Sequence, residues 1–95
     1  MYKFFLTKAF SKKAKKVLNS KEKLNCFNRV LTIMEVSPFA VNLKTHKVQS
    51  RKYGLMYSSC ITGDLRLIWN FDQEDNLILF LLDIGGHEGK GKVYK

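Results

Sequence analysis

MYSSCITGDLRLIWNFDQEDNLILFLLDI, residues 56–84, carries the pattern that decides the fold. Residues 56–61 and 65–71 are rich in branched and aromatic side chains, so we expect two strands joined by a tight turn at residues 62–64. Gly63 is expected to supply the unusual backbone angle that such a turn needs. After a second turn, residues 77–84 are apolar at nearly every position, which is typical of an interior strand covered on both faces. The stretch therefore predicts three consecutive antiparallel strands.

A strand and two amphipathic helices are expected before this stretch. Residues 2–6 form a short aromatic and apolar run, and Thr7 is placed to cap the helix that follows. Pro38 is expected to stop the second helix. The apolar stripes are Phe10, Ala14, Val17 and Leu18 in the first helix, and Leu24, Phe27, Leu31 and Met34 in the second. The order of elements predicts an α+β domain, in which a helical hairpin packs on a mostly antiparallel four-stranded sheet and leaves the other sheet face partly open.

Residues 39–53 have no clear periodicity and are expected to form a polar, basic loop with a short turn of helix. The 95 residues fit one domain, residues 1–95, because a chain of this length builds a single core. No apolar run is long enough to span a membrane, and the opening MYKFFL is too short for a signal peptide. Cys26 and Cys60 form no disulfide framework. We therefore expect a soluble cytoplasmic protein that does not bind membranes.

The charge of the chain favours a polyanionic partner. The net charge is +9. Residues 1–52 hold 13 Lys or Arg and two acidic residues, which gives a charge of +11. Residues 53–95 hold four Lys or Arg and six acidic residues, which gives −2. Such a field attracts nucleic acid or an acidic protein, and the alternative is a surface that only keeps the protein soluble. The residues expected to bind RNA are Lys12, Lys13, Lys15, Lys16, Lys44, Lys47, Arg51 and Lys52.

Few side chains are candidates for chemistry. The only histidines are His46, in the basic segment, and His87, just after the last predicted strand. Histidine titrates near neutrality and suits general acid and base catalysis on a phosphodiester, although an isolated surface histidine usually has no such role. The histidines and cysteines lack the spacing of metal ligands, so a metal site is not expected.

Arg66 lies on a strand of otherwise apolar residues. Strand alternation points it away from Leu65, Leu67 and Trp69, and so toward the open sheet face if those three residues face the helices. There it could hold a phosphate through two hydrogen bonds, or it could form an ion pair with Asp64 or Asp83. Asp64 also fits a plain turn residue. Tyr94 fits either a frayed terminus or a side chain that stacks on a base.

Three segments together resemble a known family. They are residues 43–46 (LKTH), residues 61–69 (ITGDLRLIW) and residues 82–87 (LDIGGH), followed by Val93 and Tyr94. The resemblance is to the RelE/ParE toxin superfamily, and within it to the YafQ-like branch. It implies an endoribonuclease toxin of a toxin–antitoxin pair that cuts messenger RNA in the ribosomal A site. The attacking group would be the 2′-hydroxyl, and no metal or cofactor would be required.

The resemblance also implies roles for individual residues. His46 and His87 match the two catalytic histidines, with His46 as base and His87 as acid or the reverse. Asp64 matches an acidic residue that positions the site. Arg66 matches the strand arginine of RelE-like members, which stabilises charge on the phosphate. Tyr94 lies where the family places a C-terminal aromatic residue that orients the substrate.

One departure from the YafQ pattern leaves two alternatives open. Cys60 stands where a further histidine is expected, and a thiol does not donate a proton in the same way near neutral pH. The chain could therefore be a weak or inactive ribonuclease that still binds RNA or an antitoxin. A ParE-like gyrase-inhibiting toxin is the other alternative, although that branch generally lacks the paired histidines. For a toxin of either kind we expect an acidic antitoxin, partly disordered until it binds, that covers the basic surface or displaces the tail.

Overall fold

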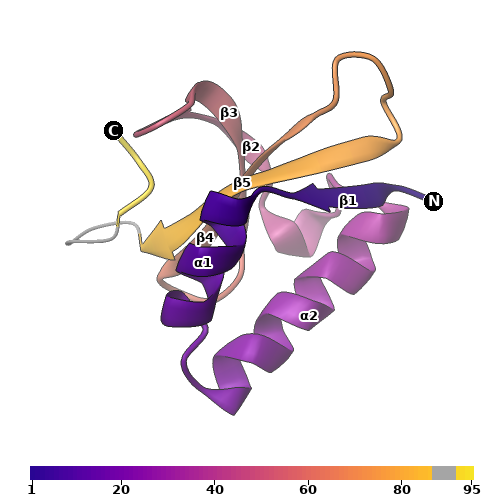
Figure 1. Cartoon of the computed structure of the whole chain (residues 1–95). Helices are drawn as coiled ribbons and strands as arrows, with labels where there is room; N and C mark the ends of the chain where they lie inside the picture. The colour runs from indigo at the N-terminus through magenta and orange to yellow at the C-terminus, as the bar shows by residue number, and fades with distance from the viewer. Residues whose placement is uncertain (87–91) are drawn as a thin grey trace.

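The computed structural model describes residues 1–86 and 92–95, which form a five-stranded sheet, two α-helices and one short 3₁₀ helix (Figure 1). Its elements in chain order are β1 (Lys3–Leu6), α1 (Lys8–Val17), α2 (Lys21–Val36), the 3₁₀ helix η1 (Val41–Leu43), β2 (His46–Ser50), β3 (Gly54–Cys60), β4 (Leu65–Phe71) and β5 (Ile78–Gly86). The α+β class and the helical hairpin packed on a mostly antiparallel sheet are confirmed. The expected number of strands was wrong, since the sheet has five rather than four.

The additional strand is β2, which lies in the segment expected to be a loop. Its sequence HKVQS contains one large apolar residue, Val48, so it lacks the apolar alternation that marks a half-buried strand. β2 is an edge strand that pairs antiparallel with β3, from His46 opposite Ser58 to Ser50 opposite Gly54. Backbone pairing with the strand that follows it in the chain therefore makes this segment a strand. The short helical turn expected in the same segment is present as η1.

The strands are arranged in the order β1-β5-β4-β3-β2. β1 pairs parallel with β5, and the other neighbours pair antiparallel. β5 is an interior strand, as its apolar sequence predicted. The sequence predicted a special backbone angle at Gly63, and this prediction was wrong. Within residues 1–86 and 92–95 the glycine with a positive φ is Gly54, the first residue of β3 (φ 74°).

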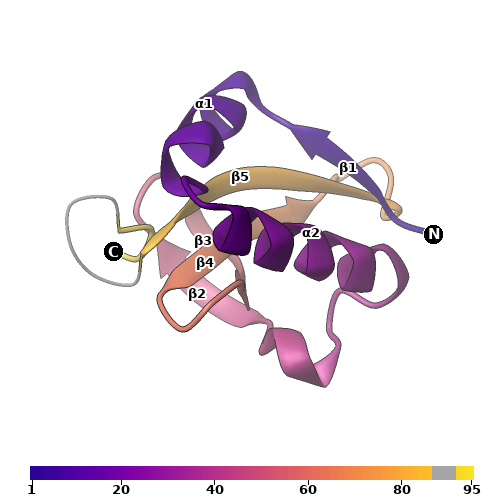
Figure 2. The same cartoon turned by 90° about the horizontal axis from the view of Figure 1, so that it is seen from below.

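The two helices take different positions against the sheet. Figures 1 and 2 show α2 lying across one face, and α1 lying beside β5 at the edge that carries β1. Thr7 caps α1 by accepting a hydrogen bond from the Phe10 backbone N–H at 3.0 Å, and Ser20 caps α2 in the same way. The buried core joins the helices to one sheet face through Phe10, Phe27, Val30, Met34, Leu67, Trp69, Leu79, Leu81 and Ile84. Leu24, expected on the buried stripe of α2, is instead 46% exposed.

The C-terminal residues are docked on the sheet. The Val93 N–H donates to the Gly86 carbonyl at the end of β5, and the Val93 carbonyl accepts from the Arg51 N–H just after β2. Tyr94 forms a bridge with Ser50, and the Val93 side chain is fully buried. These bonds connect the ends of two strands that are three positions apart in the sheet. The tail therefore packs as part of the fold, in contrast to a frayed terminus.

None of the helices in the part of the chain that the structure describes is long and apolar enough to cross a membrane.

Candidate functional site

The strand register gathers several polar side chains on the sheet face opposite α2. His46 pairs with Ser58, Ser58 pairs with Ile68, and Cys60 pairs with Arg66. Cross-strand partners point to the same face of a sheet, and residues two apart on one strand share that face. All five side chains are therefore on one face. Leu67 and Trp69 belong to the core on the other face, which confirms the orientation expected for Arg66.

His46 has a defined ring orientation at the start of β2. Its Nδ1 lies 2.8 Å from the backbone carbonyl oxygen of Lys44. A carbonyl oxygen only accepts hydrogen bonds, so Nδ1 carries the proton in this contact. The neutral ring then has its lone pair on Nε2. Because the side chain is exposed, Nε2 can accept a proton from a ligand on this face.

Lys44 directs that carbonyl through an unusual backbone conformation. It is the one residue other than glycine with a positive φ, 51°, in the part of the chain that the structure describes. This left-handed conformation costs a non-glycine residue free energy, and it follows the last residue of η1. The turn between η1 and β2 therefore holds a small strain that sets the direction of the carbonyl toward His46.

A chain of hydrogen bonds ties this turn to the core. The Thr45 hydroxyl donates to the Pro38 carbonyl at 2.7 Å, so its contact with Ser59 at 2.7 Å requires Ser59 to donate to Thr45. The Trp69 Nε1–H in turn donates to Ser59 at 2.8 Å. The chain runs from a fully buried indole to the residue directly before His46. We did not expect this network from the sequence, where the only signal was a pair of small polar residues inside the apolar strand β3.

Arg66 lies near the turn between β3 and β4. Its Nη1 donates to the carbonyl oxygens of Thr62 at 2.8 Å and Leu65 at 3.2 Å. Both bonds use one nitrogen, and a guanidinium has further N–H donors with which to hold an anion. Cys60 is next to it, since its thiol donates to the same Thr62 carbonyl at 3.0 Å. Asp64 is exposed in this turn, and its own backbone N–H lies 3.4 Å from the Thr62 hydroxyl.

His46 and Arg66 are within reach of one phosphodiester segment. They are two strands apart, with β3 between them, and their register differs by two residues. Ordinary strand spacing places their Cα atoms about 12 Å apart. Two long side chains that point to the same side can approach neighbouring atoms of one ligand across this distance. His87 lies outside the residues that the structure describes, so its role as the second histidine stays a prediction.

Tyr94 reaches the same face from the tail. Its hydroxyl lies 2.6 Å from the hydroxyl of Ser58, which is fully buried and faces His46 across the strand pair. We expect Tyr94→Phe to lower the free energy of unfolding by about 1 to 2 kcal/mol, because a buried hydroxyl loses a partner. Denaturation in urea measures this effect. Tyr53→Phe, a change at a half-buried tyrosine outside this contact, is the control, and an equal loss in both variants would contradict the assignment.

The exposed basic residues predicted to bind RNA divide into two groups toward opposite edges of the sheet. Lys12, Lys15 and Lys16 are exposed on α1, beside β5. The other group is exposed on and around β2, at the far edge of the strand order, and consists of Lys44, Lys47, Arg51 and Lys52. Lys47 lies on the helix side, with its ammonium 5.7 Å from the centre of the Tyr57 ring. Basic residues from the first half of the sequence thus lie near both edges of the sheet.

Lys13 differs from the other lysines of α1. Its ammonium forms an ion pair with Asp83 at 2.8 Å, and the Asp83 carboxylate is almost fully buried and also accepts from the Ile84 N–H. The sequence predicted that Lys13 lies on the solvated side of the helix and binds RNA, whereas in the structure it forms an ion pair with β5. Asp83, the partner in this ion pair, was expected from the sequence as a possible partner of Arg66. No sequence pattern signals this pair, because the two residues are 70 positions apart.

Lys13→Ala is expected to lower the free energy of unfolding by about 2 kcal/mol, since it leaves a buried carboxylate without its charged partner. Lys12→Ala, one position away and exposed, is expected to change it by less than about 0.5 kcal/mol. Urea denaturation of the two variants measures the difference. Equal stability of the two would contradict a structural role for the ion pair.

Solved structures with the same arrangement of strands and helices identify the fold. A copper-bound mutant toxin from Helicobacter pylori is 25% identical, with a TM-score of 0.69 over 92% of this chain and 96% of that one. The archaeal RelE in its RelE–RelB complex from Pyrococcus horikoshii is 18% identical, with a TM-score of 0.71 over 94% and 98%. YafQ from Escherichia coli is 18% identical, with a TM-score of 0.69 over 90% and 93%.

The chain has the fold of the RelE/YafQ-like toxin superfamily. No family model and no curated protein matches its sequence. The resemblance inferred from residues 43–94 is therefore confirmed through three-dimensional structure. In this RelE/YafQ-like fold, His46 and Arg66 lie on the open face of the sheet. Across residues 1–86 and 92–95, no group of three or more His, Cys, Asp or Glu side chains is arranged to hold a metal ion.

Proposed function

We propose that the chain is the endoribonuclease toxin of a toxin–antitoxin pair, and that it cleaves messenger RNA on the ribosome. The observation that carries the proposal is the ring orientation of His46, which leaves Nε2 as the proton acceptor on the same sheet face as Arg66. The similarity to RelE and YafQ in fold supports it. The positive charge at both edges of the sheet supports a polyanionic substrate.

The reaction follows from the properties of these groups. His46 Nε2 takes the proton of a ribose 2′-hydroxyl, and the 2′-oxygen attacks the adjacent phosphorus. The bond from phosphorus to the 5′-oxygen breaks, and this oxygen takes a proton, for which His87 is the expected donor. Arg66 stabilises the negative charge that builds on the phosphate oxygens. The products are a 2′,3′-cyclic phosphate and a 5′-hydroxyl, with no group supplied by a cofactor.

The chemistry of the product ends tests this proposal. Purified protein is incubated with a defined messenger RNA, with and without ribosomes, and the ends of each fragment are labelled. We expect cyclic phosphate and 5′-hydroxyl ends, and cleavage that depends on ribosomes. Fragments with 5′-phosphate ends would contradict attack by the 2′-hydroxyl. No cleavage, together with loss of DNA supercoiling by gyrase, would assign the protein to the gyrase-inhibiting alternative.

One observation favours a second candidate, a toxin with weak cleavage that still binds RNA or its antitoxin. Cys60 and Arg66 both donate to the Thr62 carbonyl. Cys60 therefore presents a thiol that already bonds to a backbone carbonyl at the position where the YafQ pattern has a histidine. Cys60→His separates the two candidates. A cleavage rate that rises tenfold or more supports the weak enzyme, whereas an unchanged or lower rate supports a site complete without that histidine.

A further inference from the structure

A hollow on the open sheet face lies close to His46. Its volume is about 380 Å³, in the range of sites that bind small ligands. Met56, which lines it, is two residues before Ser58 on β3, and Ser58 pairs with His46, so Met56 and His46 point to the same face. Asn70 on β4 also lines the hollow, and its Nδ2 donates to the Met56 Sδ at 3.4 Å. Two residues along a strand span about 7 Å, so the hollow adjoins the proposed site of cleavage.

The hollow combines an apolar floor with an acidic rim. Half-buried side chains of three strands form the floor, among them Met56, Phe80 and Leu82. The turn between β4 and β5 supplies the carboxylates of Asp72 and Glu74. In the described part of the chain, no lysine or arginine lines this hollow. We call it the acidic hollow.

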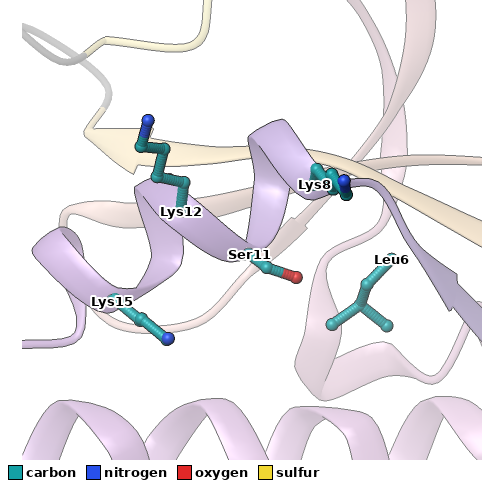
Figure 3. Close-up of a pocket in the computed structure, with 5 residues that line it drawn as sticks. All are labelled: Leu6, Lys8, Ser11, Lys12 and Lys15. Carbon is teal, nitrogen blue, oxygen red and sulfur yellow. The ribbon is translucent and has the colours of Figure 1, made fainter.

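The hollow beside α1 has the opposite charge. It is lined by Lys8, Lys12 and Lys15 together with Leu6 and Ser11, and Figure 3 shows these side chains around it. Lysines attract a phosphate, whereas carboxylates repel it. The acidic hollow therefore suits the part of a nucleotide that carries no charge, which is the base.

The two carboxylates of the rim differ in their bonds. Asp72 Oδ1 accepts a hydrogen bond from the Glu74 backbone N–H at 3.2 Å, which holds the turn. The Glu74 side chain is exposed, and its carboxylate has no hydrogen bond or ion pair with residues 1–86 or 92–95. An ionised carboxylate only accepts hydrogen bonds, and it presents two oxygens side by side. Glu74 can therefore receive two neighbouring N–H groups of one ligand.

We propose that the acidic hollow binds a guanine base of the messenger RNA and that Glu74 selects it, an inference that rests on the proposed function. The pairing edge of guanine presents two adjacent donors, N1–H and the N2 amino group, which match the two oxygens of one carboxylate. Adenine, cytosine and uracil each present a single donor group beside an acceptor. The flat apolar faces of the base pack against Phe80 and Met56. The nucleotide is thereby oriented, with its phosphate toward His46 and Arg66 and its base toward the acidic rim.

Short RNA analogues test the proposal apart from cleavage. The probes are the trinucleotides UGU, UAU, UCU and UUU with 2′-O-methyl groups, which leave no 2′-hydroxyl to attack. Calorimetry measures their dissociation constants. We expect the wild type to bind UGU at least about tenfold more tightly than the other three, the discrimination that one contact with two hydrogen bonds gives. Inosine in place of guanine, which removes the N2 amino group, should lose most of this preference.

Variants of the rim and the floor assign the effect to residues. Glu74→Gln replaces one acceptor oxygen with a donor, so its preference for UGU should fall to about twofold or less. Asp75→Asn is the matched control, because it removes one charge from the same turn, does not line the hollow and keeps the oxygen that accepts from the Leu77 N–H. It should keep the preference of the wild type. Phe80→Ala should weaken all four trinucleotides by about fivefold or more, since stacking tolerates any base. Circular dichroism establishes that each variant is folded.

Several outcomes would overturn the assignment of the acidic hollow. Equal affinity of the wild type for the four trinucleotides, or no measurable binding of any, removes base selection from it. A preference that survives Glu74→Gln, or that Asp75→Asn lowers equally, places the selection elsewhere. A wild-type dimer that Glu74→Lys dissociates assigns the hollow to the basic surface of a second copy.

The modified trinucleotides are bound and not cut, so this test does not depend on cleavage. A guanine preference in a protein that cuts no RNA would support the acidic hollow and overturn the ribonuclease. Cleavage by a protein without a guanine preference would support the ribonuclease and overturn the acidic hollow. Failure of one proposal is therefore distinguishable from failure of the other.

Discussion

His46→Ala is expected to lower the rate of RNA cleavage by about a hundredfold to ten-thousandfold, the usual contribution of a general base. The ring contributes Nε2 on the open sheet face, because Nδ1 is held by the Lys44 carbonyl at 2.8 Å. Alanine removes the proton acceptor and leaves the strand pairing of β2 in place. Single-turnover cleavage of a labelled messenger RNA on ribosomes measures the rate, and arrest of bacterial growth gives a second readout.

A control on the same strand separates chemistry from folding. Gln49 is exposed on β2 and points to the opposite face from His46, so Gln49→Ala should leave cleavage within about twofold. His46 is exposed, and its replacement should leave the thermal midpoint nearly unchanged. Cleavage that survives in His46→Ala would remove His46 from the reaction. A large fall in the thermal midpoint would instead show that the ring supports the fold.

Trp69→Ala is expected to lower the free energy of unfolding by about 3 to 5 kcal/mol. Trp69 is fully buried, stacks on Tyr57 with ring centres 5.0 Å apart, and contacts Phe71 edge to face at 5.2 Å. Its indole N–H also begins the hydrogen-bond chain through Ser59. A domain of this size has a total stability of about 5 to 15 kcal/mol, so the loss approaches unfolding. Urea denaturation followed by circular dichroism measures it.

Two further variants divide this effect into packing and hydrogen bonding. Phe39→Ala removes a ring that contacts Trp69 at 5.9 Å but is 52% exposed, so it should cost much less than Trp69→Ala. Trp69→Phe keeps an aromatic ring in the core but removes the donor to Ser59 and part of the buried volume, with an expected cost of about 1 to 3 kcal/mol. A Trp69→Ala variant as stable as Phe39→Ala would contradict the central place of this side chain in the core.

The sequence predicted the elements whose signals are local. Strand β4 and the cap Thr7 were found because branched residues, helical stripes and capping hydroxyls act within a few residues of one another. The orientation of Arg66 was also predicted, since alternation along a strand fixes the face of each side chain. The segment patterns led to the RelE/YafQ-like resemblance, which the solved structures confirm for the fold.

Local pattern failed where contacts with another element decide the structure. β2 has one large apolar residue, and its partner β3 supplies the backbone bonds that make it a strand. Lys13 has the sequence surroundings of a solvated lysine, yet its position beside β5 pairs it with Asp83. Leu24 follows the core stripe and remains half exposed, since no element of the described chain covers that part of α2.

The sequence by itself determined the candidate residues and the sheet face of Arg66, because residue type and alternation are properties of the local chain. The tertiary structure decided how those residues combine. The left-handed Lys44 turns its carbonyl toward His46, and the chain from Trp69 to Thr45 holds that turn against the core. The bonds of this chain join residues 14 and 10 positions apart in sequence. Contacts of this kind form only when the strands have assembled into the sheet. For that reason no pattern along the chain could predict them.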